Sequence, residues 1–182
     1  MAGFFKRLFN RKDPAKMDAA RIYQAVMVQA RQPGFYGPAK AADNYDGRID
    51  VLTLHLSVVL HVLNDFDEQG KRLSQALYET MREDFDIALR EEGLSDTGVM
   101  KRIKPMIRLF YTRIKSYTDA FDAEDRKVAL MEAFQKGLLK ESKKSDFSGV
   151  LSDYVLSLRD QLDGKTIGQI ALVDFEFPEF NF

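Results

Sequence analysis

The residues best suited to chemistry lie where the chain enters one expected helix, over residues 48–66. Asp46 and Asp50 supply carboxylates there and His55 an imidazole, groups that can hold a metal ion or move a proton. Asp43 adds a third carboxylate. On a helical wheel Asp50 and His55 lie about 140° apart, so one ion cannot readily bind both. We expect a buried His55 held by a carboxylate; the alternative is a small metal-dependent or acid–base enzyme centred on Asp46, Asp50 and His55.

Common catalytic signatures are missing from the sequence. It has no His-Glu-x-x-His, no glycine-rich phosphate loop and no Gly-x-Ser-x-Gly. It also has no cysteine, which excludes disulfides, thiolate metal ligands and a cysteine nucleophile, and favours the reducing cytoplasm over secretion. We therefore predict a cytoplasmic protein that is not an enzyme and has no cofactor or metal.

The expected helix over residues 48–66 organises the rest of the fold. Its polar positions fall in one narrow stripe, and from Ile49 to Leu63 only His55 interrupts the apolar residues around the remaining circumference. A helix of this kind has to be surrounded by other elements, so we place it at the centre of a helical domain. The stripe consists of Asp50, Thr53, Ser57, His61 and Asn64.

Helical periodicity elsewhere predicts the walls around that centre. A chain of 182 residues with 45% hydrophobic and 30% charged residues suits one globular domain. We predict an all-α, single-domain bundle of about six helices around the central one. Pro105 should kink or restart one helix, and residues 173–178, which alternate with period two, should form an extended C-terminal strap. The expected wall helices cover residues 19–31, 70–92, 96–121, 123–139 and 147–162.

The first residues form a basic, aromatic segment. Residues 1–16 carry a net charge of +4, which leaves −5 for residues 17–182, the expected helical domain, in a chain of net charge −1. No stretch is apolar enough for a signal peptide or a spanning helix. Residues 3–12 predict a short amphipathic helix that binds an anionic membrane or, as an equal alternative, docks its rings on the domain. The expected membrane-binding residues are Phe4, Phe5, Lys6, Arg7, Leu8, Phe9, Arg11 and Lys12.

Charged residues supply further candidates for binding. We expect Arg48 to pair with Asp84 or Glu91, or otherwise to face a partner. Asp86 and Arg90 should form an outward i,i+4 pair. The acidic balance of the main domain argues against nucleic acid, DNA included, as a partner. A basic stripe opposite an apolar face is usually just solvated, but it gives the remaining partner-binding candidates, namely Lys101, Lys104, Arg108 and Lys115.

Several short motifs follow one another from about Ala20 to the strap. Together they resemble the ubiquinol–cytochrome c chaperone family. Thr112, where the family pattern has glycine, and Pro105 depart from it. The motifs are Tyr36-Gly37, Asp46-Gly47-Arg48 leading to Leu54-His55, Asp86-x-x-Leu89-Arg90-Glu91-x-Gly93-x-x-Asp96, Val99-x-Lys101-Arg102-Ile103-Lys104, and Phe110-Tyr111-x-Arg113 with Tyr117.

The resemblance implies a helical, non-catalytic assembly factor for the respiratory cytochrome bc1 complex. Its expected partners are cytochrome b, or a bc1 assembly intermediate, and an anionic membrane surface. Mitochondrial members also work with a small partner subunit and near the ribosomal tunnel exit. Because no transit peptide is evident, the chain is similar to a bacterial member that lies in the cytoplasm, peripheral to the inner membrane. For such a member the small subunit and the ribosome contact stay open.

Overall fold

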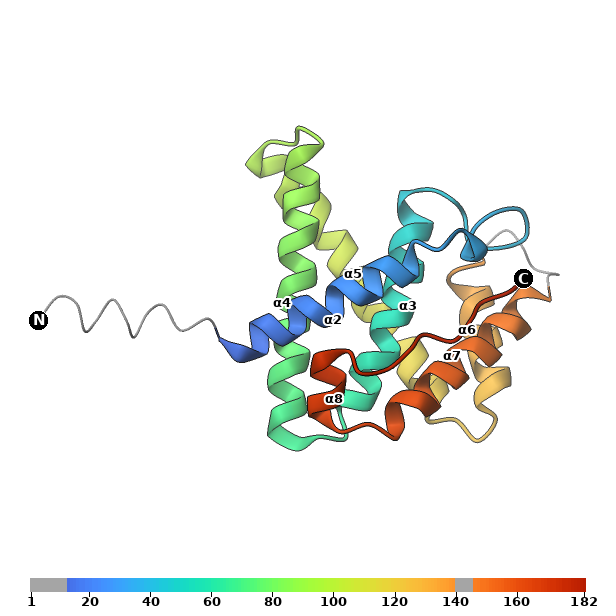
Figure 1. Ribbon diagram of the computed structural model, residues 1–182. Coiled ribbons are helices and arrows are strands. Elements are labelled where there is room, and N and C mark those ends of the chain that lie inside the picture. Colours follow the sequence, from blue (N-terminus) through green and yellow to red (C-terminus); the bar gives the residue numbers. More distant parts are fainter. Residues whose placement is uncertain (1–12, 140–145) are drawn as a thin grey trace, which may run out of the picture.

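The computed structural model describes residues 13–139 and 146–182, and within these ranges it is an all-α fold without β-strands (Figure 1). The predicted fold class is confirmed, whereas the short helix α8 was not expected. The basic segment over residues 3–12 lies outside the described residues. None of the described helices is long and apolar enough to cross a membrane. The helices are α2 (Pro14–Ala30), α3 (Tyr45–Leu63), α4 (Asp67–Glu91), α5 (Asp96–Phe121), α6 (Arg126–Lys136), α7 (Phe147–Asp163) and α8 (Ile167–Leu172), with a 3-10 turn at Pro33–Phe35.

Helix α3 is the predicted central helix. Of its 19 residues, 14 are buried, because α2, α4, α5 and α7 all pack against it (Figure 1). Part of its polar stripe is enclosed as well, since Thr53 and Ser57 are buried. Ser57 satisfies its hydroxyl within the helix by donating to the carbonyl oxygen of Leu54 at 2.6 Å.

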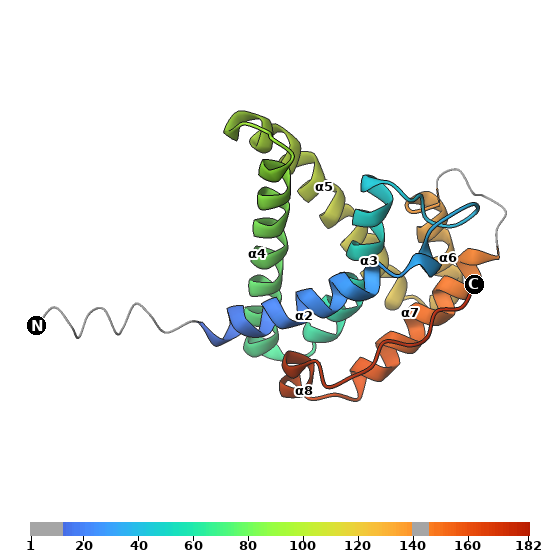
Figure 2. The same cartoon turned by 45° about the horizontal axis from the view of Figure 1, so that its top comes forward.

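Helices α4 and α5 form a long hairpin, and its tip stands away from the other helices in both views (Figures 1 and 2). Gly93, just after α4, has a φ of 85° and therefore takes the left-handed conformation expected of a helix cap. Ser95 begins α5 by accepting a hydrogen bond from the backbone N–H of Gly98 at 3.3 Å. The outer flank of α5, which includes Met100, Lys104 and Tyr111, is exposed.

Pro105 does not restart α5, so of the two predicted outcomes, a kink or a restart, the restart is wrong. The helix continues from Asp96 to Phe121 through this position. A proline cannot donate to the carbonyl four residues earlier, on Lys101. Both residues are exposed, so water can satisfy that carbonyl. The helix tolerates the proline because packing on its buried side continues on both sides of it.

The residues after α8 cross the bundle as the predicted extended strap, beside α7 (Figure 2). Phe180 stacks on Phe35 with ring centroids 4.3 Å apart, and meets Tyr154 edge-on at 5.2 Å. Lys40 donates to the carbonyl oxygen of Phe182 at 2.7 Å. These contacts hold the strap against α7 and the loop that precedes α3.

A tight contact at Gly70 fixes the turn from α3 into α4. A Cβ at this position would lie 1.9 Å from the carbonyl oxygen of Leu63. We predict that Gly70→Ala lowers the free energy of unfolding by about 2 kcal/mol, because the backbone must shift to admit the methyl group. Gly149→Ala is the matched control in α7, where nothing lies within 4 Å of the added carbon. It should be neutral or stabilise by up to about 1 kcal/mol. Urea unfolding measures both variants, and equal effects would contradict this packing.

Candidate functional site

The turn into α3 positions Arg48 at the surface. Asn44 caps the helix by accepting a hydrogen bond from the backbone N–H of Gly47 at 2.9 Å. Gly47 is needed for close packing, since a Cβ there would lie 2.0 Å from the carbonyl oxygen of Ala42. The preceding loop therefore packs directly on the first turn of α3 and fixes the direction in which Arg48 leaves it.

Arg48 pairs with Asp43, which corrects the predicted pairing with Asp84 or Glu91. Its Nη2 atom lies 2.8 Å from Oδ1 of Asp43. Asp84 is instead bonded to the hydroxyl of Tyr23 at 2.8 Å. Asp43 lies in the adjacent loop, so the pair orders little additional chain. The two side chains are 53% and 55% exposed, so the pair is weak and Arg48 stays available to a partner.

Arg48 also borders a groove of about 410 Å³ between α2, α3 and α4. Arg31 supplies its second cation and Asp84 its carboxylate. The Tyr36 ring lies 5.3 Å from the Arg48 guanidinium, and burial raises the pKa of Tyr36 to about 12, so its hydroxyl stays neutral. Such a groove can bind an apolar segment of another protein. The two arginines can then donate hydrogen bonds to carboxylates or backbone carbonyls of that segment. Its apolar lining comes from Met27, Ala30, Tyr45, Ile49, Leu52, Phe85 and Ala88.

A buried ion pair joins α3 to α5. Arg113 donates from Nε to Oδ1 of Asp50 at 2.8 Å, and both side chains are only 10% exposed. Burial alone would lower the pKa of Arg113, but the hydrogen bond and the charge of Asp50 outweigh it and raise that pKa. Asp50 is therefore held as a structural carboxylate. The sequence indicates Arg113 only as part of a motif, because no local pattern predicts a partner 63 residues away.

His55 is buried as predicted, but its partner is a hydroxyl rather than a carboxylate. Its Nδ1 lies 2.8 Å from the carbonyl oxygen of Val51, which can only accept, so Nδ1 carries the proton. Nε2 then accepts from the hydroxyl of Tyr154 at 2.8 Å, and that hydroxyl accepts from the Gln29 amide at 3.0 Å. Burial lowers the pKa of His55 to about 4, so the ring is neutral. A hydroxyl suits this place because it costs less to bury than a carboxylate.

Asp46 and Asp50 line one pocket of about 460 Å³, but His55 is not among its residues, so the three predicted residues do not form one site. Asp50 is bound to Arg113, and His55 is enclosed by the Tyr154 hydroxyl and the Phe35 ring, 5.1 Å away. Across residues 13–139 and 146–182, no three His, Cys, Asp or Glu side chains are grouped as metal ligands would be.

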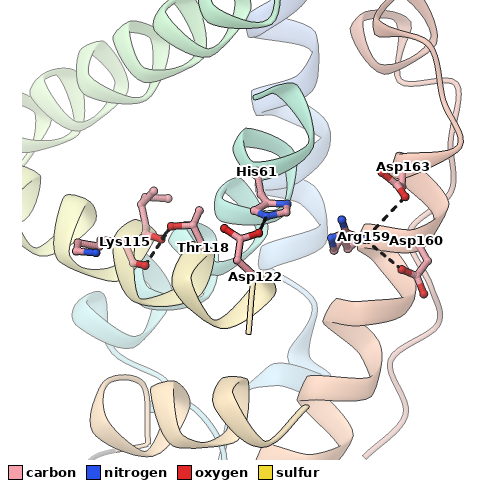
Figure 3. A network of polar contacts seen from close by, with 8 residues as sticks. His61, Lys115, Thr118, Asp122, Arg159, Asp160 and Asp163 are labelled. Atoms are coloured by element: carbon pink, nitrogen blue, oxygen red, sulfur yellow. Dashed lines mark hydrogen bonds and ion pairs between the residues drawn. The ribbon is translucent and has the colours of Figure 1, made fainter. Parts of the chain in front are cut away.

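The second histidine joins the ends of two helices. Figure 3 shows His61, near the end of α3, with Nε2 bonded to Oδ1 of Asp122, which follows α5, at 3.0 Å. Arg159 of α7 lies nearby and pairs within its own helix with Asp160 at 3.5 Å and Asp163 at 3.9 Å. The contact between His61 and Asp122 ties α3 to the end of α5, at the opposite end of α3 from Arg48.

The predicted outward pair on α4 is confirmed. Nε of Arg90 lies 3.0 Å from Oδ2 of Asp86, and Nη1 bonds Asp96 across the hairpin turn. Within the basic stripe of α5, Lys115 pairs with Asp119 at 2.7 Å. The other three residues of the stripe are exposed and have no ion pair within the described ranges. These residues are Lys101, Lys104 and Arg108.

The described residues form an all-helical fold in which buried polar pairs join helices, among them Asp50 with Arg113 and His55 with Tyr154. The family model for ubiquinol–cytochrome c chaperones matches residues 39–177. The chain belongs to that family. The crystal structure of the Cbp3 homolog from Brucella abortus is similar, with a TM-score of 0.79 and 31% sequence identity, over 97% of each chain. A comparison with curated proteins gave no match.

We predict that His55 makes stability depend on pH. Its pKa falls from 6.5 in the unfolded chain to about 4 in the folded protein, so the unfolded chain binds the extra proton between these values. Stability should therefore be complete above pH 6.5 and fall by about 3 kcal/mol as pH drops to 4. Denaturant unfolding of the wild type and of His55→Gln across this range tests it. The variant lacks this term, so parallel curves for the two proteins would contradict the assignment.

We also predict that Arg113→Met destabilises by about 3 kcal/mol, because it leaves Asp50 buried and charged without a partner. Arg113→Met combined with Asp50→Leu should recover most of that loss, since an apolar pair of similar volume needs no charge compensation. Arg48→Met is the matched control at an exposed ion pair and should cost less than about 1 kcal/mol. Thermal unfolding of the wild type and these three variants gives the comparison.

Proposed function

We propose that this protein is a non-enzymatic assembly chaperone of the cytochrome bc1 complex that binds newly made cytochrome b beside the membrane. The observation that carries the proposal is the similarity to the Cbp3 homolog over 97% of both chains, together with family membership. The engagement of Asp50 and His55 in internal contacts supports a binding role over the acid–base alternative. The protein would act in the cytoplasm, peripheral to the inner membrane.

The groove between α2, α3 and α4 is the client site that we favour. Its apolar lining suits a segment of a membrane protein that has not yet found its partner helices, because such a segment exposes apolar side chains. Arg31 and Arg48 are exposed and can contact acidic side chains, or the free carbonyls at a helix C-terminus, at its edge. Neither arginine has a strong competing ion pair, so the client would displace little.

The family motifs support this location. Tyr36 and Arg48, from two separate motifs, meet at one end of the groove, with the guanidinium 5.3 Å from the ring centre. The loop that carries Tyr36 is locked by its hydrogen bond to the carbonyl oxygen of Ala30. A preformed wall of this kind reduces the ordering cost of binding.

The test combines loss of function with cross-linking in the organism of origin. Deleting the gene should lower the amount of assembled bc1 complex and of haem-loaded cytochrome b, and the wild-type gene should restore both. Arg31→Glu with Arg48→Glu should restore neither, because two repulsive charges then line the groove. Arg126→Glu with Lys127→Glu, on exposed positions of α6, is the matched control and should restore both.

Site-specific photo-cross-linking locates the contact. A photoreactive residue at Met27, which lines the groove, should capture cytochrome b during its synthesis, whereas one at the neighbouring Val28, 55% exposed and outside the groove, should not. Normal bc1 complex in the deletion strain would refute the chaperone function. Capture at Val28 but not at Met27 would refute the groove alone.

A further inference from the structure

The outer flank of α5 combines exposed apolar side chains with cations. Met100 is 61% exposed and Tyr111 is 54% exposed, and the partly buried Ile107 lies between them. On the helical wheel these three fall within about 40°, in a row about 17 Å long. Large apolar side chains are usually exposed singly rather than in a row on one helix. This row therefore requires an explanation.

Three cations flank the apolar row. Lys104, Arg108 and Lys101 occupy about the next 60° of the wheel. All three are exposed, and in the described part of the chain none of them has an ion pair. Residues 97–112 contain four cations and no Asp or Glu, so this stretch is positive. By contrast, Arg90 of α4 and Lys115, farther along α5, are held in ion pairs.

We propose that this flank of α5 binds an anionic phospholipid surface. Met100, Ile107 and Tyr111 would enter the boundary between headgroups and acyl chains, and Lys101, Lys104 and Arg108 would contact lipid phosphates. Apolar residues beside unpaired cations on one helix are what interfacial binding uses. Tyrosine suits this depth because its ring is apolar and its hydroxyl can stay in water.

The shape of the hairpin admits a planar partner. The tip of α4 and α5 projects from the bundle in both views, and Met100, Lys101 and Lys104 are exposed on the part of α5 near it (Figures 1 and 2). The tip itself carries Glu91, Glu92 and Asp96, which an anionic surface repels, so contact falls along the flank of α5.

Charge also favours lipid over the client for this surface. The flank has three exposed cations without ion pairs in the described ranges, which a layer of anionic headgroups can contact together, whereas the apolar lining of the groove suits a client segment. The inference deepens the proposed function, since it names the surface that would hold the chaperone at the membrane. It does not require cytochrome b, so vesicles alone can test it.

The first experiment measures co-sedimentation of the full chain with anionic phosphatidylglycerol vesicles and neutral phosphatidylcholine vesicles. Each cation near an anionic surface contributes about a fivefold gain in binding. Lys101→Glu, Lys104→Glu and Arg108→Glu together should therefore weaken binding to anionic vesicles by on the order of 100-fold or more at low salt. The matched control reverses the charge of three exposed cations on other helices, namely Lys71, Arg126 and Lys136. This control should bind anionic vesicles like the wild type.

The second experiment reports contact at the row itself. The chain has no tryptophan, so Tyr111→Trp places the only tryptophan of the protein in the apolar row. Its emission should shift to the blue with anionic vesicles and be quenched by brominated lipid. Val128→Trp, at a 50% exposed position on α6, is the matched control and should do neither.

Three outcomes would overturn the proposal. If the triple charge reversal binds anionic vesicles like the wild type, the contact lies elsewhere on the chain. If the fluorophore of the Tyr111→Trp variant stays solvent-exposed while the protein is bound, the row does not enter the lipid. If the reversal leaves vesicle binding unchanged but abolishes capture of cytochrome b, the flank is a client surface. Circular dichroism of each variant verifies that the fold is retained.

Discussion

Every polar side chain on the inner part of α3 has to find its partner inside the protein, because other helices cover it on all sides. Asp50 finds Arg113 on α5, and His55 finds Tyr154 on α7, which Gln29 of α2 supports in turn. Apolar packing alone tolerates small shifts between helices, whereas hydrogen bonds have fixed lengths and directions. These contacts therefore set the positions of α2, α5 and α7 relative to the centre.

Using these polar groups for the scaffold leaves recognition to the surface. The two surfaces argued for differ in shape and chemistry: the groove is concave and apolar with two arginines, and the flank of α5 is convex with apolar and cationic rows. Helix α4 lies between them, since it lines the groove with Phe85 and packs against α5 through Tyr78, whose ring is 5.5 Å from that of Tyr111. A client leaving the membrane near α5 would thus meet the groove one helix away.

Periodicity was sufficient to predict every described α-helix except α8, the central position of α3 and the strap, because these follow from which residues avoid water. It could not predict the partners of polar residues. Helix faces predicted that Arg48 pairs with Asp84 or Glu91, but the loop between Tyr36 and Asn44 brings Asp43 closer, and loop geometry has no periodic signal. Arg113 and Tyr154 were missed as partners because their contacts join segments 63 and 99 residues apart. The family resemblance identified the class of protein, which the residue pattern could not.

The strap has a consequence for the order in which this protein can fold. Phe180, near the C-terminal end of the sequence, stacks on Phe35, near its start. Arg21 of α2 donates to the carbonyl oxygen of Ala171, 150 residues away, at 2.6 Å. Such long-range contacts raise the contact order above that of a simple helical bundle and slow folding. The early helices can form as they leave the ribosome, but the rings of Phe35 and Tyr154 stay open to water until the strap is made. During that interval the nascent protein has an apolar surface that can aggregate, so it has the same vulnerability as the clients it is proposed to protect.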